Sequence, residues 1–145
     1  MSYRHILAAI DYSKNCKSVL QKAIFLATQQ QAILSVMHVV DNLPLSGTAY
    51  GTEIDLGADV ANPLLELEKS LFIEELAEFN DIDMARNLVW GVPKQEIIHY
   101  ADREAVDLIL VGSHGRHGLE LILGSTANAV LHHAHCDVLA VRISD

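Results

Sequence analysis

Short apolar runs alternate with segments of helical periodicity from one end of this chain to the other. Runs of this length and character are typical of strands that are buried on both faces of a sheet. They lie at residues 5–10, 33–40, 86–90, 106–111 and 137–143. Strands that alternate with helices in this way form a parallel sheet with helices on both faces. The sequence therefore predicts a doubly wound α/β fold with five parallel strands.

The segments between these runs predict four helices. They cover residues 14–30, a segment that Pro63 opens as its first residue, and residues 96–101 and 126–133. In the second helix we expect a buried stripe of apolar residues: Leu64, Leu67, Leu71, Leu76 and Phe79. The stretch 41–62 before this helix is rich in Gly, Pro, Asn, Thr and Ser, which predicts a long irregular loop of a functional or mobile kind.

Length and composition point to one domain and exclude several kinds of partner. The 145 residues suit a single domain, 1–145, and 50% of them are hydrophobic. The net charge of −9 argues against a nucleic-acid partner. No apolar run is long enough to cross a membrane, and the first residues lack the plan of a signal peptide. Two distant cysteines, Cys16 and Cys136, favour a reducing compartment, so we expect a cytoplasmic protein.

Polar residues and glycines gather at the ends of the predicted strands, where folds of this class bind ligands. A doubly wound sheet holds its ligand beyond the carboxyl ends of its strands, at the point where the strand order reverses. Asp11 follows the first strand, and a glycine-containing loop that begins at Gly112 follows the fourth. We expect Asp11 to accept hydrogen bonds from a ligand. In the alternative interpretation, Asp11 caps the turn into the first helix.

The segment from Gly112 to Thr126 is the most informative part of the chain. Its glycines, Gly115 and Gly124 among them, lie between a strand and a helix, where the backbone approaches a ligand closely or adopts a positive φ. Ser125 and Thr126 begin that helix, and their hydroxyls and backbone amides are suited to phosphate. The segment is neither a Walker A loop nor the dinucleotide fingerprint. In the alternative interpretation, the glycines only permit tight turns and Ser125 only caps the helix.

The glycine spacing resembles the signature of the universal stress protein family, in the branch that binds ATP. That signature is Gly, two residues, Gly, nine residues, Gly and then Ser or Thr, and here it runs through Gly112, Gly115, Gly124 and Ser125. The spacing departs from it once, because only residues 116–123 separate the second glycine from the third. The resemblance covers nearly the whole chain, through residues 6–13, 38–39, 91–93, 105–115 and 135–141.

The resemblance implies an adenine nucleotide alpha-hydrolase-like fold that binds ATP, with or without Mg²⁺. Asp11 and the backbone near Val39 would then hold the adenosine. The ribose and phosphates would contact the glycine loop and the helix start: Gly112, Gly115, Gly124, Ser125 and Thr126. His114 is a further candidate for contact with phosphate, although a solvated loop residue is an equal alternative. The short spacer decides whether Gly124 and Ser125 reach the phosphates.

The sequence contains no set of residues arranged for catalysis. Ser13, Ser113 and Ser125 each have a turn or cap explanation, and no Gly-x-Ser-x-Gly elbow occurs. The histidines and the cysteine of residues 132–136 could suggest a metal site. We favour the simpler interpretation that the histidines lie near the negative end of a helix and that the cysteine is a small buried hydrophobe. We expect His38, on an apolar strand, to be a satisfied core or rim residue.

The last strand is expected to lie at an edge of the sheet and to pair with its copy in a homodimer. An exposed apolar edge is a liability unless it is paired, and the family pairs this strand across a two-fold axis. The residues expected near this contact are Val138, Leu139, Ala140, Val141 and Ile143. The favoured function is a dimeric regulator of the stress response that changes shape or protein partner when ATP binds. The alternatives are a stress-related interaction protein with a vestigial pocket, and a slow ATPase or nucleotidyl transferase.

Overall fold

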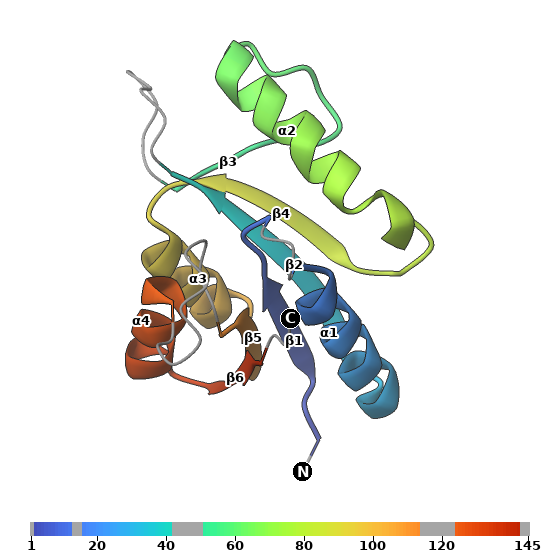
Figure 1. The fold of residues 1–145 in the computed structure, drawn as a ribbon, viewed down its shortest axis with the longest axis vertical. Helices are drawn as coiled ribbons and strands as arrows, with labels where there is room; N and C mark the ends of the chain where they lie inside the picture. Colours follow the sequence, from blue (N-terminus) through green and yellow to red (C-terminus); the bar gives the residue numbers. More distant parts are fainter. Residues whose placement is uncertain (1, 13–15, 42–50, 114–123, 143–145) are drawn as a thin grey trace.

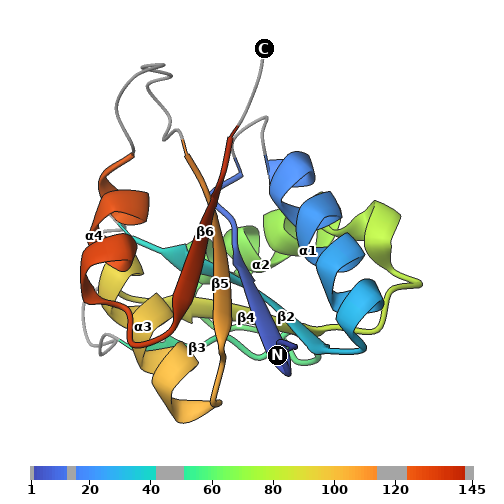
Figure 2. The ribbon, with the colours of Figure 1, turned by 90° about the horizontal axis from the view of Figure 1, so that it is seen from below.

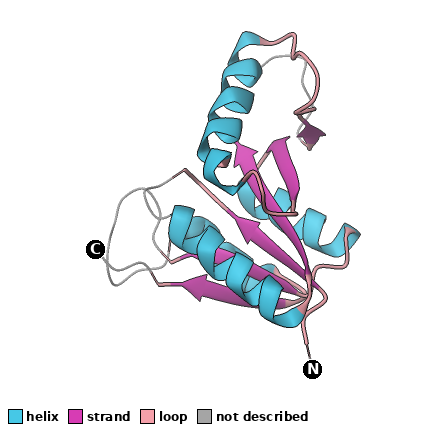
Figure 3. Ribbon diagram, turned by 90° about the vertical axis from the view of Figure 1, so that its right-hand side faces the viewer, coloured by secondary structure: helices cyan, strands magenta, loops and turns pink. Residues whose placement is uncertain are grey.

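The sheet and its helices are seen in a computed structural model, which describes residues 2–12, 16–41, 51–113 and 124–142. In these residues the chain forms a six-stranded sheet with the order β3-β4-β2-β1-β5-β6 (Figure 1). The strands are β1 (His5–Ala9), β2 (Ile33–Val40), β3 (Thr52–Glu53), β4 (Ala85–Trp90), β5 (Leu108–Gly112) and β6 (Asp137–Val141). All neighbouring strands are parallel except β3 and β4 (Figure 3). The predicted α/β fold is confirmed, and all five predicted parallel strands are present.

Two pairs of helices cover the two faces of the sheet. The helices are α1 (Cys16–Gln30), α2 (Pro63–Glu75), α3 (Pro93–Arg103) and α4 (Ser125–His133), with a short 3-10 helix at Ala77–Phe79. Figure 2 shows α1 and α2 on one side of the sheet and α3 and α4 on the other. Because β2 lies on one side of β1 and β5 on the other, the strand order reverses between β1 and β5. None of the helices in the described residues is long and apolar enough to cross a membrane.

An apolar core fills each side of the sheet, because successive strand residues point to opposite faces. Residues of one parity pack with α1 and α2, among them Ile6, Ala8, Val36, Leu108 and Leu110. Residues of the other parity pack with α3 and α4, among them Leu7, Met37, Val39, Ile109 and Val111. The same alternation assigns a residue just beyond the end of a strand to one face or the other.

The antiparallel strand β3 lies inside the stretch for which the sequence predicts an irregular loop. Thr52 pairs with Trp90 and Glu53 pairs with Val89 on β4. Backbone bonds on both sides extend the pairing, from Gly51 N to Trp90 O at 2.7 Å and from Ile54 N to Leu88 O at 2.9 Å. The sheet therefore has six strands, one more than predicted, and β4 is covered by β3 at its outer edge.

The buried face of α2 differs from the predicted one. The prediction is wrong for three residues of the stripe, which are exposed by 38%, 56% and 41%: Leu64, Leu67 and Leu71. Leu65 and Phe72 face the sheet instead. The prediction is confirmed for Leu76 and Phe79, which lie just beyond the helix and are buried. The start of the helix at Pro63 is also confirmed, with Asn62 as the N-cap.

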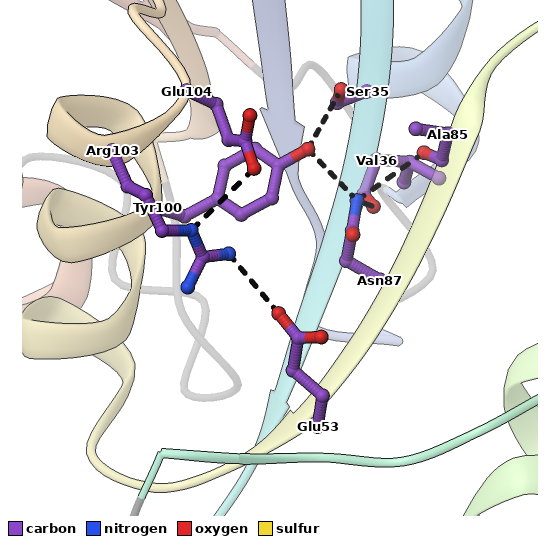
Figure 4. A network of polar contacts seen from close by, with 8 residues as sticks. All are labelled: Ser35, Val36, Glu53, Ala85, Asn87, Tyr100, Arg103 and Glu104. Atoms are coloured by element: carbon purple, nitrogen blue, oxygen red, sulfur yellow. Dashed lines mark hydrogen bonds and ion pairs between the residues drawn. The ribbon is translucent and has the colours of Figure 1, made fainter.

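A chain of hydrogen bonds ties α3 to the sheet near the amino ends of the strands (Figure 4). The Tyr100 hydroxyl donates to Ser35 Oγ at 3.0 Å and accepts from Asn87 Nδ2 at 3.3 Å. Ser35 Oγ also lies 2.7 Å from Nε2 of His5. The other ring nitrogen of His5, Nδ1, lies 3.0 Å from the carbonyl oxygen of Glu104, which can only accept. Nδ1 therefore donates, and in a neutral ring Nε2 accepts from Ser35. Both hydroxyls of this network, those of Ser35 and Tyr100, therefore have hydrogen-bond partners.

Candidate functional site

The ends of β1, β2 and β5 meet at the carboxyl edge of the sheet. Ala9 pairs with Met37, so Asp11 and Val39 each lie two residues beyond that pair. Gly112 ends β5 two residues beyond Leu110, which pairs with Ala8 of β1. The structure thus brings three of the predicted site residues, Asp11, Val39 and Gly112, to the edge where the strand order reverses.

The backbone of Val39 faces the side of β2 on which β1 ends. The ladder alternates along β2: the carbonyl of Met37 accepts from Ile10 N at 2.9 Å, and the carbonyl of Val40 accepts from Gly91 N at 3.0 Å on the opposite side. Val39 has the parity of Met37, so its peptide groups point toward β1, whose last strand residue is Ala9. The Val39 side chain is buried among α3 and α4 residues. A ligand at this edge would therefore meet backbone of Val39 and not its side chain.

The start of α4 lies directly beside the end of β5. The amide of Gly124 donates to the carbonyl of Ser113 at 3.1 Å, and the amide of Ser113 donates to Val141 O at 2.9 Å. Gly124 is the N-cap, and no side chain caps the helix. Ser125 is the exposed first residue of α4 and Thr126 the half-buried second. The interpretation of Ser125 as a helix cap is therefore wrong, because Gly124 holds that position. The first amides of α4 point toward the carboxyl edge of the sheet and favour an anion there.

Two of the predicted contacts, His114 and Gly115, lie outside the described residues, as does Ile143 at the expected dimer contact. The prediction that loop glycines adopt a positive φ finds no support at Gly124, whose φ is −58°. This glycine instead gives the start of α4 an N-cap without a side chain.

Tyr12, which the sequence did not single out, follows Asp11 with φ at 62°. Its ring stacks on that of His38, with centroids 3.9 Å apart and planes at 26°. Nδ1 of His38 donates to the carbonyl of Ile10 at 2.8 Å, which confirms the expectation of a satisfied buried histidine. Burial, and then the carboxylates of Glu68 and Glu75, raise the pKa of the Tyr12 hydroxyl. The hydroxyl therefore stays protonated across the physiological range.

Two buried hydroxyls at this edge have no hydrogen-bond partner among the described residues: Tyr12 Oη and Ser113 Oγ. A turn that begins at Ser113 would continue into residues outside the described part of the chain, so the turn or cap role expected for Ser113 stays a prediction. Ser113 directly follows the end of β5, and Tyr12 lies three residues beyond the end of β1; these positions near strand ends are the one signal in the sequence that could have found them. Buried polar groups are nearly always paired, so unpaired ones call for a physical reason.

The histidines and the cysteine of residues 132–136 do not form a metal cluster. Nδ1 of His135 pairs with Asp102 at 3.1 Å, and α4 ends at His133, before Cys136. Burial raises the pKa of the Cys136 thiol to about 11, with the carboxylates of Asp102 and Asp137 adding to the effect. Across the part of the chain that the structure describes, no three His, Cys, Asp or Glu residues are placed to hold a metal ion.

Comparisons with known proteins agree with this architecture. The sequence pattern of the universal stress protein family matches residues 2–142. Two relatives from Coxiella burnetii are universal stress protein A homolog 1, 41% identical over 100% of both chains, and homolog 2, 43% identical over 98% of this chain and 97% of its own. The solved structure of the hypothetical protein MJ0577 superimposes with a TM-score of 0.75 at 25% identity, over 100% of this chain and 99% of its own.

Two further solved structures contain a nucleotide. A universal stress protein in complex with cAMP has a TM-score of 0.64 and 20% identity, and covers 97% of this chain and 98% of its own. A universal stress protein from Archaeoglobus fulgidus in complex with dAMP has a TM-score of 0.61 and 20% identity over the same shares. At this identity the likeness concerns the fold.

Proposed function

Because the chain belongs to the universal stress protein family, we propose that it is a cytoplasmic regulator that binds ATP at the carboxyl edge of its sheet. The observation that carries the proposal is the meeting of the α4 N-terminus with the ends of β1 and β5, where the strand order reverses. Ligands of doubly wound folds bind at such a point. The structures of family members with cAMP and dAMP support an adenine nucleotide as the ligand class.

The two ends of the site suit the two ends of the nucleotide. The Asp11 carboxylate can accept from ribose or adenine, and the outward-facing peptide groups of Val39 can pair with the base. Adenine would then form hydrogen bonds with backbone groups, so the side chain of Val39 can stay buried although the ligand is polar. Glycines and helix amides would hold the phosphates: Gly112, Gly115, Gly124, Ser125 and Thr126, with His114 beside them. Where Mg²⁺ accompanies ATP, it would be held mainly by the phosphates, with Asp11 acting through water.

We propose little or no hydrolysis of the bound ATP. A general base must lie within hydrogen-bond reach of the attacking water. Among the described residues, His38 lies at this edge, yet its Nδ1 donates to Ile10 and its ring stacks on Tyr12. It is therefore placed to hold the strand ends together, and ATP would act as a bound signal that alters shape or partner.

Calorimetric titration of Mg-ATP into nucleotide-free protein tests the proposal, after a denatured sample has been checked for nucleotide that co-purified. We expect about one site per chain with micromolar affinity, or roughly −8 kcal/mol. Asp11→Ala should weaken binding at least tenfold, while Asp55→Ala, on an exposed turn, should leave it unchanged. The absence of both heat and carried-over nucleotide would contradict the proposal and favour a vestigial pocket. Sustained phosphate release that disappears in Asp11→Ala would indicate a slow ATPase instead.

A further inference from the structure

The hydroxyl of Ser113 is a polar group that the folded chain buries and leaves without a partner. Ser113 is 9% exposed, and among the described residues nothing accepts from or donates to its Oγ. Burying a hydroxyl without a hydrogen bond costs free energy, so its persistence at a strand end calls for a compensating role. Its backbone is fully engaged, with the amide bonded to Val141 and the carbonyl to Gly124.

The chain satisfies a comparable buried serine elsewhere in the same sheet. Ser35, 1% exposed near the amino end of β2, bonds to both the Tyr100 hydroxyl and the His5 ring. The contrast is therefore between the two edges of one sheet and not between two kinds of residue. At the amino edge the buried serine hydroxyl has hydrogen-bond partners, whereas at the carboxyl edge the buried serine hydroxyl has none among the described residues.

Strand parity places the Ser113 side chain on the face that α4 covers. Ile109 and Val111 share its parity and pack with Ala127 of α4. The carbonyl of Ser113 accepts from Gly124, the N-cap of α4, at 3.1 Å. This bond places residue Ser113, which carries the hydroxyl, beside the first turn of this nine-residue helix.

We propose that Ser113 is a phosphate-binding residue, whose hydroxyl donates a hydrogen bond to a phosphate oxygen of the bound nucleotide beside the α4 N-terminus. This inference rests on the proposed function and adds a residue and a ligand group to it. A serine hydroxyl donates well to a charged oxygen, and the helix amides attract the same anion. The bond exists only in the complex, so the hydroxyl contributes to affinity and not to the stability of the free protein.

The other unpartnered hydroxyl, that of Tyr12, does not suit an anion. Tyr12 packs on the opposite face of the sheet, against the α1 and α2 core. The carboxylates of Glu68 and Glu75 act on its hydroxyl there. A phosphate at that hydroxyl would meet like charge, whereas Ser113 faces the positive end of a helix dipole.

The test compares Ser113→Ala with the matched variant Ser35→Ala, using ATP, adenosine and inorganic tripolyphosphate as probes. We expect Ser113→Ala to weaken ATP about tenfold, equivalent to about 1.4 kcal/mol, to weaken tripolyphosphate likewise, and to leave adenosine unchanged. Without ligand, its melting temperature should equal or exceed that of the parent. Ser35→Ala should show the reverse pattern, with a lower melting temperature and unchanged ATP affinity.

Each other outcome overturns a stated part of the inference. Unchanged ATP affinity in Ser113→Ala rejects the role of Ser113 while the nucleotide site stands. An equal loss for adenosine moves the contact to the nucleoside and rejects the phosphate assignment. A lower melting temperature of ligand-free Ser113→Ala would show that the hydroxyl has a partner within the free protein, and would reject the inference that it bonds only to the nucleotide. If the parent binds tripolyphosphate but not ATP, the proposed function fails and the tripolyphosphate affinity of the variant decides the role of Ser113. If the parent binds neither probe, both proposals fail.

Discussion

At the scale of single residues, Tyr12 has the most unusual backbone of the site. Three non-glycine residues among those described have a positive φ: Tyr12, Gln31 and Ala105. The latter two follow α1 and α3, and the next residue in each case bonds back five positions into the helix, as in a Schellman motif. Tyr12 instead follows a strand, where no helix end explains its φ. Strained backbone of this kind clusters at ligand sites, because the surrounding structure must hold it in place.

Tyr12 and Tyr100 should respond oppositely to loss of the hydroxyl. Tyr12→Phe removes a buried oxygen without a partner, so we expect the free energy of unfolding to stay constant or to rise by up to about 1 kcal/mol. Tyr100→Phe breaks the bonds to Ser35 and Asn87 and should cost about 1–3 kcal/mol. Urea unfolding of both variants measures the difference. If Tyr12→Phe and Tyr100→Phe lowered the free energy of unfolding equally, the conclusion that the Tyr12 hydroxyl has no hydrogen-bond partner would be contradicted.

The buried thiol of Cys16 makes stability depend on alkaline pH. Burial, and then the carboxylate of Glu75, raise the pKa of this thiol to about 12. The unfolded chain releases that proton near the ordinary pKa of 9.0, so between pH 9 and 12 the folded state holds more protons than the unfolded state. Stability should therefore fall as pH rises above 9, by up to about 1.4 kcal/mol per pH unit for this group.

Urea unfolding at pH 8, 9 and 10 measures this slope, and Cys16→Ala should reduce it. Cys136→Ala is a second test, since burial raises the pKa of its thiol to about 11 and this variant should reduce the slope over the same pH range. An identical slope in the parent and in Cys16→Ala would show that the thiol does not titrate differently in the two states.

At the scale of elements, a side chain fixes the start of α2. Oδ1 of Asn62 accepts from the amides of Leu64 at 2.9 Å and Leu65 at 3.3 Å. Asn62→Ala should lower the free energy of unfolding by about 1 kcal/mol, as is usual for loss of an N-cap. Asn62→Asp keeps the acceptor and should retain the stability of the parent. Thermal unfolding of the three proteins gives the comparison, and equal losses in both variants would exclude capping as the cause.

The elements that could be predicted from sequence are those whose signal is local. The runs that became β1, β2 and β5 are apolar along their length, because helices cover both of their faces. β3 could not be predicted in this way, since its two residues, Thr52 and Glu53, are polar and exposed. Its strand conformation comes from pairing with β4, which lies more than thirty residues later in the chain.

The face of α2 could not be predicted because its periodicity fits two faces. Leu64, Leu67 and Leu71 are spaced as a stripe, but so are Leu65 and Phe72 with Lys69 between them. The lysine argues against burial in the sequence, yet it is only 8% exposed. Its Nζ donates to the carbonyl of Ala58 at 2.7 Å and pairs with Glu66 at 3.1 Å, which makes burial possible. The buried face of α2 therefore depends on hydrogen-bond partners of Lys69 that the apolar pattern of the helix does not reveal.

The residues of the candidate site also fall into those that could be predicted from sequence and those that could not. Asp11, Val39 and Gly112 could be placed at the sheet edge from sequence, because each ends an apolar run. The unpaired hydroxyls of Tyr12 and Ser113 could not, since the pairing of a side chain depends on tertiary contacts. The alternative interpretation of Ser125 as a helix cap was wrong for a smaller reason: a glycine and a serine next to each other can both serve as N-cap, and Gly124 occupies that position.

At the scale of the whole molecule, the two edges of the sheet differ. One edge is β3, two residues long and antiparallel, and the other is β6, five residues long and parallel to its neighbour. On β6, Leu139 is 37% exposed. We propose that β6 pairs with its copy across a two-fold axis, as the family resemblance implies.

Sedimentation tests this pairing. The parent chain should sediment at twice its mass of 15.9 kDa. Leu139→Lys places a charge at the contact in both copies and should shift the protein to the monomer at micromolar concentration. Thr52→Lys adds the same charge to the opposite edge and should leave the dimer intact. A parent that sediments as a monomer, or a Leu139→Lys variant that stays dimeric, would exclude β6 as the contact.

The difference between the two edges sets how many neighbours one copy of this sheet can take. A sheet with two long open edges can pair with one neighbour at each edge, and head-to-tail addition of further copies can then continue as a fibre. Here β3 shortens one edge to two residues and presents Glu53 on it, so that a single edge stays available for strand addition. A molecule with a single edge available for pairing can form only a dimer. In the proposed pairing through β6, the two-residue strand β3, which the sequence did not reveal, would limit assembly to a dimer.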